Sequence, residues 1–129
     1  MSGFVDSYED QLLDLVLRNQ SFVPPTTVYV ALFTTAPSDD GTGGVEVSGG
    51  GYTRMSVTFS AASGGSISNS GVIEFPAATA SWGTVTSMGL YTASTAGSLI
   101  MFGNLSASQL VDTNTILRFP AASIVVTLD

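Results

Sequence analysis

The chain contains no cysteine, no histidine and no lysine, and its only three basic residues are arginines. Without cysteine, neither a disulfide nor a thiolate zinc site can form, so packing and hydrogen bonds must hold the fold together. Without histidine and lysine, a serine nucleophile has no base, because neither the Ser-His-Asp nor the Ser-Lys arrangement can be built. We therefore expect a protein with no enzymatic activity, no cofactor and no metal ion.

Charge is also scarce. Charged residues make up 10% of the sequence and the net charge is -7, whereas an ordinary soluble domain is roughly 25% charged. Nucleic acids and anionic membranes bind clustered Lys and Arg, so neither is expected as a partner. A surface built from Ser, Thr, Gly and Ala repels its own copies only weakly, which is typical of assembly subunits and also of secreted β-domains.

Long apolar runs are missing too. None approaches the roughly eighteen residues of a membrane span. Residues 1–10 are acidic and lack the basic and apolar regions of a signal peptide. We therefore expect synthesis in the cytoplasm without Sec export.

Carboxylates are the remaining candidates for chemistry. Asp39, Asp40 and Glu46 lie in a glycine-rich stretch, and Glu74 lies at the end of a predicted strand. Glycosidases use two carboxylates across the scissile bond, but a flexible loop holds such groups poorly, and Trp82 is the only tryptophan. The Asp39-Asp40-Gly41 segment lacks the alternating acidic pattern of a calcium loop. We expect solvated turn residues here.

Residues Asp6 to Asn19 have the apolar spacing of a helix, with Asp6 or Ser7 as the expected cap and Arg18 in the last turn. The apolar arc nearly encircles so short a helix. It could lie wholly on its own sheet, lie between that sheet and another protein, or bundle with copies of itself. The residues that we expect in a subunit interface are Leu12, Leu13, Val16 and Leu17, together with Trp82, which is alternatively a core anchor.

After Pro24 and Pro25, which end the helical segment, the pattern predicts strands. We expect a mainly β fold, an antiparallel β-sandwich of about 7–8 strands (jelly-roll or Ig-like) preceded by one short helix, with residues 1–25 as helix and linker and 26–129 as the β-domain. The longest connector, Pro37 to Gly51, is expected to be mobile or ordered by a partner. The predicted strands are Val28–Thr35, Gly51–Ser60, Val72–Phe75, Thr84–Tyr91, Leu99–Asn104, Thr115–Phe119 and Ser123–Leu128.

A short motif occurs twice. Glu74-Phe75-Pro76-Ala77-Ala78 is echoed by Arg118-Phe119-Pro120-Ala121-Ala122. Two copies are too few for a solenoid. The echo indicates either equivalent corners of a two-sheet structure, with Phe as core anchor and Pro ending the strand, or chance similarity in an alanine-rich chain.

Three segments together carry a family resemblance: Pro25 to Thr34 (PTTVYVALFT), Glu46 to Arg54 (EVSGGGYTR) and Ala80 to Thr86 (ASWGTVT). With the preceding helix, Phe75-Pro76-Ala77-Ala78 and the closing Val126-Thr127-Leu128-Asp129, the chain resembles a widespread family of small tailed-phage and prophage proteins, usually labelled phage tail fibre or virion structural proteins. The likeness covers nearly the whole chain and brings no catalytic residues with it.

The resemblance implies a non-enzymatic component of the virion, made in the bacterial host cytoplasm. The role that we expect is that of a capsid decoration or cement protein in contact with the major capsid protein, because the small size without a repetitive shaft favours this placement. As a tail-fibre or baseplate accessory it would contact tail or baseplate proteins, which the family labels favour. A homotrimer is expected in either case. A carbohydrate-binding domain is a further alternative, which clustering of Tyr52, Trp82 and Tyr91 at one loop-rich end would support.

Overall fold

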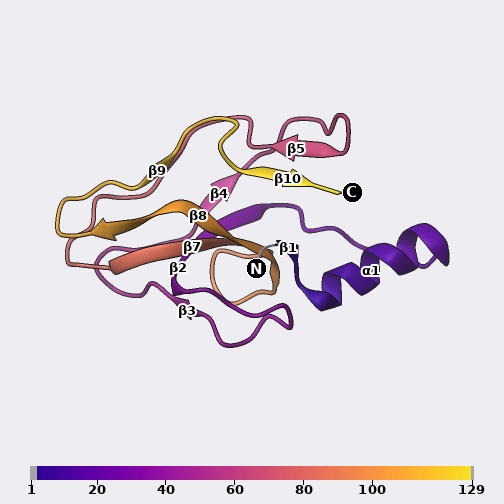
Figure 1. Ribbon diagram of the computed structural model, residues 1–129, viewed down its shortest axis with the longest axis horizontal. Helices are drawn as coiled ribbons and strands as arrows, with labels where there is room; N and C mark the ends of the chain where they lie inside the picture. Colours follow the sequence, from indigo (N-terminus) through magenta and orange to yellow (C-terminus); the bar gives the residue numbers. More distant parts are fainter. Residues whose placement is uncertain (1–2, 129) are drawn as a thin grey trace.

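A computed structural model describes residues 3–128 as a mainly β protein built on one six-stranded antiparallel sheet (Figure 1). The strands run in the order β1-β8-β7-β2-β3, and β4 pairs with another part of β2. Their bounds are β1 Gly3–Phe4, β2 Val28–Thr35, β3 Val45–Glu46, β4 Met55–Val57, β7 Gly83–Tyr91 and β8 Leu99–Val111. The predicted mainly β, antiparallel class is confirmed.

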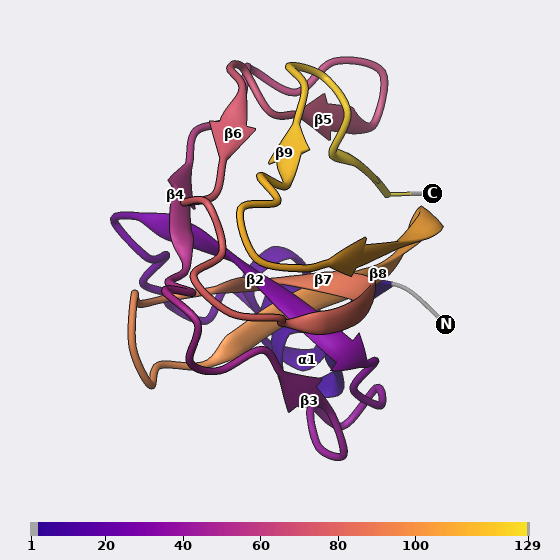
Figure 2. The same ribbon diagram turned by 90° about the vertical axis from the view of Figure 1, so that its left-hand side faces the viewer.

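The second layer is smaller than the first. It consists of two antiparallel pairs: β5 (Ser66–Ser68) with β10 (Val125–Thr127), and β6 (Ile73–Glu74) with β9 (Arg118–Phe119). Viewed along the long axis, this layer arches over the main sheet and leaves one side open between β10 and β8 (Figure 2). The sandwich therefore does not close into a barrel.

The core lies between the two layers. In β2, alternation directs Val30 and Leu32 toward the second layer, where both are fully buried, while Phe33 faces the other side of the sheet and stacks with Tyr91. The repeated Phe-Pro motif forms adjacent corners, because β6 and β9 pair directly and the rings of Phe75 and Phe119 are 6.3 Å apart. The interpretation of the echo as equivalent corners thus fits the structure.

Asn69 holds the second layer together. Its side chain is buried, its Nδ2 donates to the carbonyls of Gly71 (2.7 Å) and Pro120 (3.0 Å), and its Oδ1 accepts from the Ile124 N–H (2.8 Å). A buried amide is tolerated only when it is hydrogen-bonded in this way. One side chain therefore fixes the end of β5 to the turn that leads into β10.

Helix α1 spans Asp6–Leu17 and projects from one end of the molecule (Figure 1). The expected cap at Asp6 or Ser7 is wrong: Val5 is the N-cap residue, and no side chain caps the helix. Instead the Asp6 N–H donates to the carbonyl of Asp39 at 2.8 Å. Val5 takes this position because its side chain is buried against Leu99 and Phe102, which places the chain reversal one residue earlier.

The predicted strands Gly51–Ser60 and Thr115–Phe119 are shorter in the structure, where they are β4 and β9. Three further differences concern the length of β8, the connectors and the N-terminal residues. Strand β8 continues to Val111, seven residues beyond the expected end, because residues 109–111 pair with β7 again after an irregularity in the ladder. Two segments expected to be connectors contain short strands: Pro37 to Gly51 contains β3, and Ala61 to Gly71 contains β5. Residues 3 and 4, assigned above to the helical segment, form β1 and pair with β8. No helix within residues 3–128 is long and apolar enough to span a membrane.

Candidate interaction surfaces

Helix α1 has no buried residue. Its side toward the body is anchored by Tyr8, which packs against the core clusters and meets Phe22 edge to face. Of the residues predicted to form an interface, Leu12 is half-buried, whereas Leu13, Val16 and Leu17 are 58%, 75% and 75% exposed. These three residues, which we call the outer face of α1, are related by i, i+3 and i+4 spacing and form one apolar ridge.

Trp82, the fifth residue of the predicted interface, lies elsewhere. It is 5% exposed and immediately precedes β7, and its indole Nε1–H donates to the Gly50 carbonyl at 2.8 Å. Gly50 has φ +60, and a Cβ there would lie 2.9 Å from the indole ring, so the loop can approach Trp82 only as glycine. The structure thus places Trp82 in the core, in agreement with the alternative role as an anchor.

The aromatic rings that could have formed a sugar platform are covered by neighbouring side chains: Trp82 is buried, and Tyr52 and Tyr91 are half-buried. Tyr52 stacks on Phe75 at 6.2 Å and meets Trp82 edge to face at 5.5 Å. The ring of Tyr91 is covered by the guanidinium of Arg54, 3.7 Å from the ring centroid. Because sugar sites need exposed aromatic faces, this arrangement counts against the carbohydrate-binding alternative.

Glu46, Tyr52 and Arg54 form a hydrogen-bonded cluster on the main sheet. Arg54 contacts the carboxylate with two donors, Nε to Oε2 at 2.8 Å and Nη2 to Oε1 at 2.9 Å. Tyr52 donates its hydroxyl to Glu46 Oε2 (2.6 Å) and accepts from the Leu32 N–H (3.0 Å). Charge-assisted, two-donor contacts of this kind are among the stronger polar interactions in proteins.

This cluster sets the protonation of its members. Partial burial alone would raise the pKa of Glu46, but the hydrogen bonds from Arg54 and Tyr52 outweigh it and lower that pKa below its ordinary value. Burial, together with the bond to the Glu46 carboxylate, raises the pKa of Tyr52. The bond to Glu46 also raises the pKa of Arg54. Glu46 is therefore held as a carboxylate and its oxygens are already occupied, which suits a structural tie and not a general acid.

Arg54 also reaches the hairpin between β7 and β8. Its Nη1 donates to the carbonyls of Ala93 (3.0 Å) and Ala96 (2.7 Å). Within the hairpin, the Thr92 N–H donates to the Ser98 carbonyl. Ala96 has a positive φ of 53. One guanidinium thus fixes the connector from Pro37 to Gly51, which holds Glu46, against a hairpin about forty residues later in the chain.

The acidic residues outside this cluster include Asp40, in the connector from Pro37 to Gly51. Asp40 accepts hydrogen bonds from the N–H and hydroxyl of Thr42, and these bonds lower the pKa of Asp40. This is the turn role that the sequence predicts for Asp40. Within the described part of the chain, no three acidic side chains gather in a way that could hold a metal ion.

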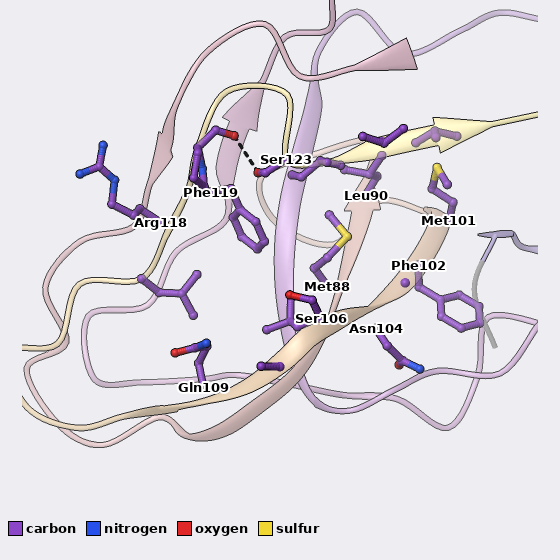
Figure 3. A pocket seen from close by; sticks show the side chains of 18 of the residues that line it. Met88, Leu90, Met101, Phe102, Asn104, Ser106, Gln109, Arg118, Phe119 and Ser123 are labelled. Atoms are coloured by element: carbon purple, nitrogen blue, oxygen red, sulfur yellow. Dashed lines mark hydrogen bonds between the residues drawn. The ribbon is translucent and has the colours of Figure 1, made fainter. Parts of the chain in front are cut away.

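A groove of about 860 Å³ opens between β8 and the segment that carries β9 and β10 (Figure 3). Core residues such as Met88 and Leu90 form its floor, and Met101 and Phe119 line it. Three of the exposed large hydrophobic residues also line it, namely Leu110, Ile116 and Val125. Arg118 lies at the opposite end of the groove from Met101 and Phe102 (Figure 3).

Sequence reasoning did not find the groove or the Arg54 cluster. The groove is lined by residues from both ends of the chain, including Phe4 and Val126. Local sequence patterns do not predict contacts between segments so far apart in the chain. The Arg54 cluster had a weak signal: Glu46 and Arg54 are oppositely charged residues that border one glycine-rich loop in a chain with few charges.

The comparisons with known proteins agree with the resemblance noted above. A family model described as podophage GP4 fiber I protein gp80 matches residues 3–127. No curated protein shows significant similarity to the chain. Because the family model covers the full β-body together with α1, we conclude that the chain belongs to the podophage GP4 fiber I protein gp80 family, a group of phage fibre structural proteins.

Proposed function

We propose that this protein is a structural subunit of a phage fibre that works by binding neighbouring protein subunits, without enzymatic activity. The observation that carries the proposal is the outer face of α1, an apolar ridge that projects into solvent from the end of the molecule. The family of fibre structural proteins to which the chain belongs supports the same reading and implies a virion component.

The energetics of α1 explain why a partner is needed. A helix of 12 residues is marginal in water on its own and depends on packing for its stability. Here the packing on the body is confined to Tyr8 and its neighbours in the first turns. Burying a Leu or Val side chain contributes about 1.5–3 kcal/mol, so covering the outer face would stabilise both the helix and the contact.

Capsid decoration is the second candidate. Residues 3–128 form a compact body and contain no long repetitive shaft, which suits a small protein bound over the major capsid protein as well as an accessory subunit of a fibre. The outer face of α1 would serve as the contact in both placements. The family description favours the fibre.

Particle fractionation tests the proposal. Phage particles are separated into tails with fibres and tailless heads, and each fraction is probed with an antibody against this protein. Enrichment with the fibre fraction supports the proposal, and enrichment on tailless heads supports decoration instead. Absence from both fractions would overturn a structural role in the particle.

A pair of variants ties the result to α1. Val16→Ser with Leu17→Ser removes apolar surface that the free subunit does not bury, so the subunit still folds and its incorporation into particles falls. Val23→Ser is the matched control, because Val23 is 89% exposed but lies outside the helix. Equal incorporation of both variants would show that the outer face is not the contact.

A further inference from the structure

Two apolar surfaces of this molecule lack a partner in the single chain. Among residues 3–128, four of the eleven exposed large hydrophobic residues lie on α1 and three line the groove between β8 and β10. Exposed apolar surface that is concentrated in this way marks a contact site. One surface is a convex ridge and the other is a concave groove, so the two are complementary in shape as well as in chemistry.

A helix cannot fill the groove of its own chain. Figures 1 and 2 place α1 on the opposite side of the main sheet from β5, β9 and β10, and beyond the end of that sheet. The contact between the two surfaces must therefore form between different copies. A strand added to the free edge of β8 would extend the sheet, but it would leave the apolar lining between the layers uncovered.

The distribution of charge also favours a contact between α1 of one copy and the groove of another. Arg18 binds Asp14 at 3.1 Å and Arg54 binds Glu46, whereas Arg118 makes no salt bridge to any residue within 3–128. Its neighbour across the β6–β9 ladder is Glu74, which is not within salt-bridge distance. Arg118, the one basic residue without a salt bridge in the described chain, thus borders one end of the groove, and its exposed side chain points outward from it (Figure 3).

The first turns of α1 carry negative charge, which is opposite to the charge of Arg118 at one end of the groove. Glu9 lies four residues before Leu13 and seven before Val16, which places its carboxylate on the outer face of α1. Asp6 and Asp10 crowd it, and desolvation together with these neighbours raises the pKa of Glu9. In a bundle of parallel α1 helices these acidic turns would meet and repel one another, so self-bundling is disfavoured. A cation supplied by a second surface would relieve the crowding.

We propose that the groove between β8 and β10 receives α1 of a second copy of this chain, with Leu13, Val16 and Leu17 against the apolar lining and the acidic first turns toward Arg118. This inference rests on the proposed function in that it names the partner of the outer face. The contact joins two different surfaces, so its repetition gives a ring where the rotation between successive copies closes and an open filament where it does not.

Disulfide cross-linking tests the contact directly, because the chain has no cysteine of its own. Purified Val16→Cys protein is mixed with purified Ser106→Cys protein and mildly oxidised. Ser106 lies in the middle of the groove lining (Figure 3), and disulfides form only when the two Cα atoms come within about 7 Å. The expected result is a cross-linked dimer that contains one copy of each variant.

The control replaces Ser106→Cys by Ser94→Cys, an exposed serine in the β7–β8 hairpin away from the groove. Cross-linking of Val16→Cys to Ser94→Cys at the same level would overturn the proposal. So would a dominant disulfide within Val16→Cys protein alone, because that product indicates helices bundled with each other.

Charge exchange tests the orientation. Arg118→Glu is expected to lower the cross-linked fraction roughly two- to fivefold, in the range of an exposed ion pair. Combining Arg118→Glu with Glu9→Arg is expected to restore it, and failure of this rescue would contradict the orientation proposed here. Leu13→Asp is expected to lower the fraction to that of the Ser94→Cys control.

The two proposals can fail separately. If the α1 variants lose incorporation into particles but Val16→Cys and Ser106→Cys do not cross-link, the helix binds a different protein, and the second-copy inference falls while the fibre role stands. If cross-linking occurs but the protein is absent from particles, the fibre role falls while the contact between copies stands.

Discussion

Glu46 shows how a single carboxylate can organise a surface with few charges. It accepts from both Arg54 and Tyr52, and the Arg54 guanidinium in turn covers Tyr91 and binds two hairpin carbonyls. The ionised form of Glu46 is the one that makes these contacts. Folding therefore favours loss of its proton, which links stability to pH.

Glu46→Gln is expected to lower the free energy of unfolding by about 1–2 kcal/mol at pH 7, the lower part of the range for charged hydrogen bonds because the side chain is a quarter exposed. The folded-state pKa of Glu46 is depressed. Its contribution to stability is therefore complete above the unfolded-state pKa and is lost as the pH falls through the folded-state pKa.

Urea unfolding from pH 7 down to about 3 should show the difference in unfolding free energy between wild type and variant shrinking below the unfolded-state pKa of about 4.3. Glu74→Gln, an exposed carboxylate, serves as the comparison, and a difference that stays constant with pH would contradict this account.

At the scale of elements, the short ladders of the second layer depend on side-chain ties more than on their own length. Strands β5 and β10 pair over three residues, and β6 and β9 pair over two. Pairs of this length are not stable alone. Asn69 supplies part of the missing support through its bonds to Pro120 and Ile124.

Asn69→Ala is expected to destabilise the protein by roughly 2–4 kcal/mol, because it removes three hydrogen bonds and leaves the N–H of the buried Ile124 without a partner. Asn69→Asp keeps the acceptor for the Ile124 N–H but loses both donors, so it should rescue little of the loss. Urea denaturation measures both variants, with Asn104→Ala on the exposed part of β8 as the control. A cost for Asn69→Ala no larger than that of the control would show that the amide is not a tie.

The strands with strong alternation were predictable and the irregular ones were not. Val28–Thr35 was predicted with the bounds that β2 has, because its apolar side chains fill both faces of the sheet. The second half of β8 was missed, since residues 106–109 lack apolar alternation and the ladder with β7 is interrupted between Asn104 and Gln109. The helix cap failed for a related reason: a backbone carbonyl from Asp39, distant in sequence, replaced the expected side chain.

At the scale of the whole molecule, the two layers share one core. Phe75 from the second layer packs with Tyr52 and Trp82, and one continuous cluster also includes Leu32 from the main sheet. The layers should therefore unfold together. The open side between β10 and β8 could not be foreseen from local pattern, because it depends on where the chain ends meet.

Trp82, the only tryptophan, gives a probe of this cooperativity. Thermal unfolding followed by its fluorescence is expected to coincide with unfolding followed by far-ultraviolet circular dichroism, as for a two-state domain of this size. Separate midpoints would indicate that the second layer melts before the main sheet. Circular dichroism of the Trp82→Phe variant, which lacks the fluorescent probe, is the control. A single unfolding transition in this variant, as in the wild type, would show that Trp82 behaves as an ordinary core residue.

The hydrogen bond from Asp6 to the Asp39 carbonyl has a mechanical consequence. It attaches the base of the projecting helix to the same connector that carries Glu46, and Glu46 is attached through Arg54 to the hairpin at Ala93 and Ala96. The helix cannot tilt unless that connector follows or the bond breaks. A force applied to α1 by a neighbouring subunit would thus be transmitted through these hydrogen bonds to the β7–β8 hairpin of the main sheet.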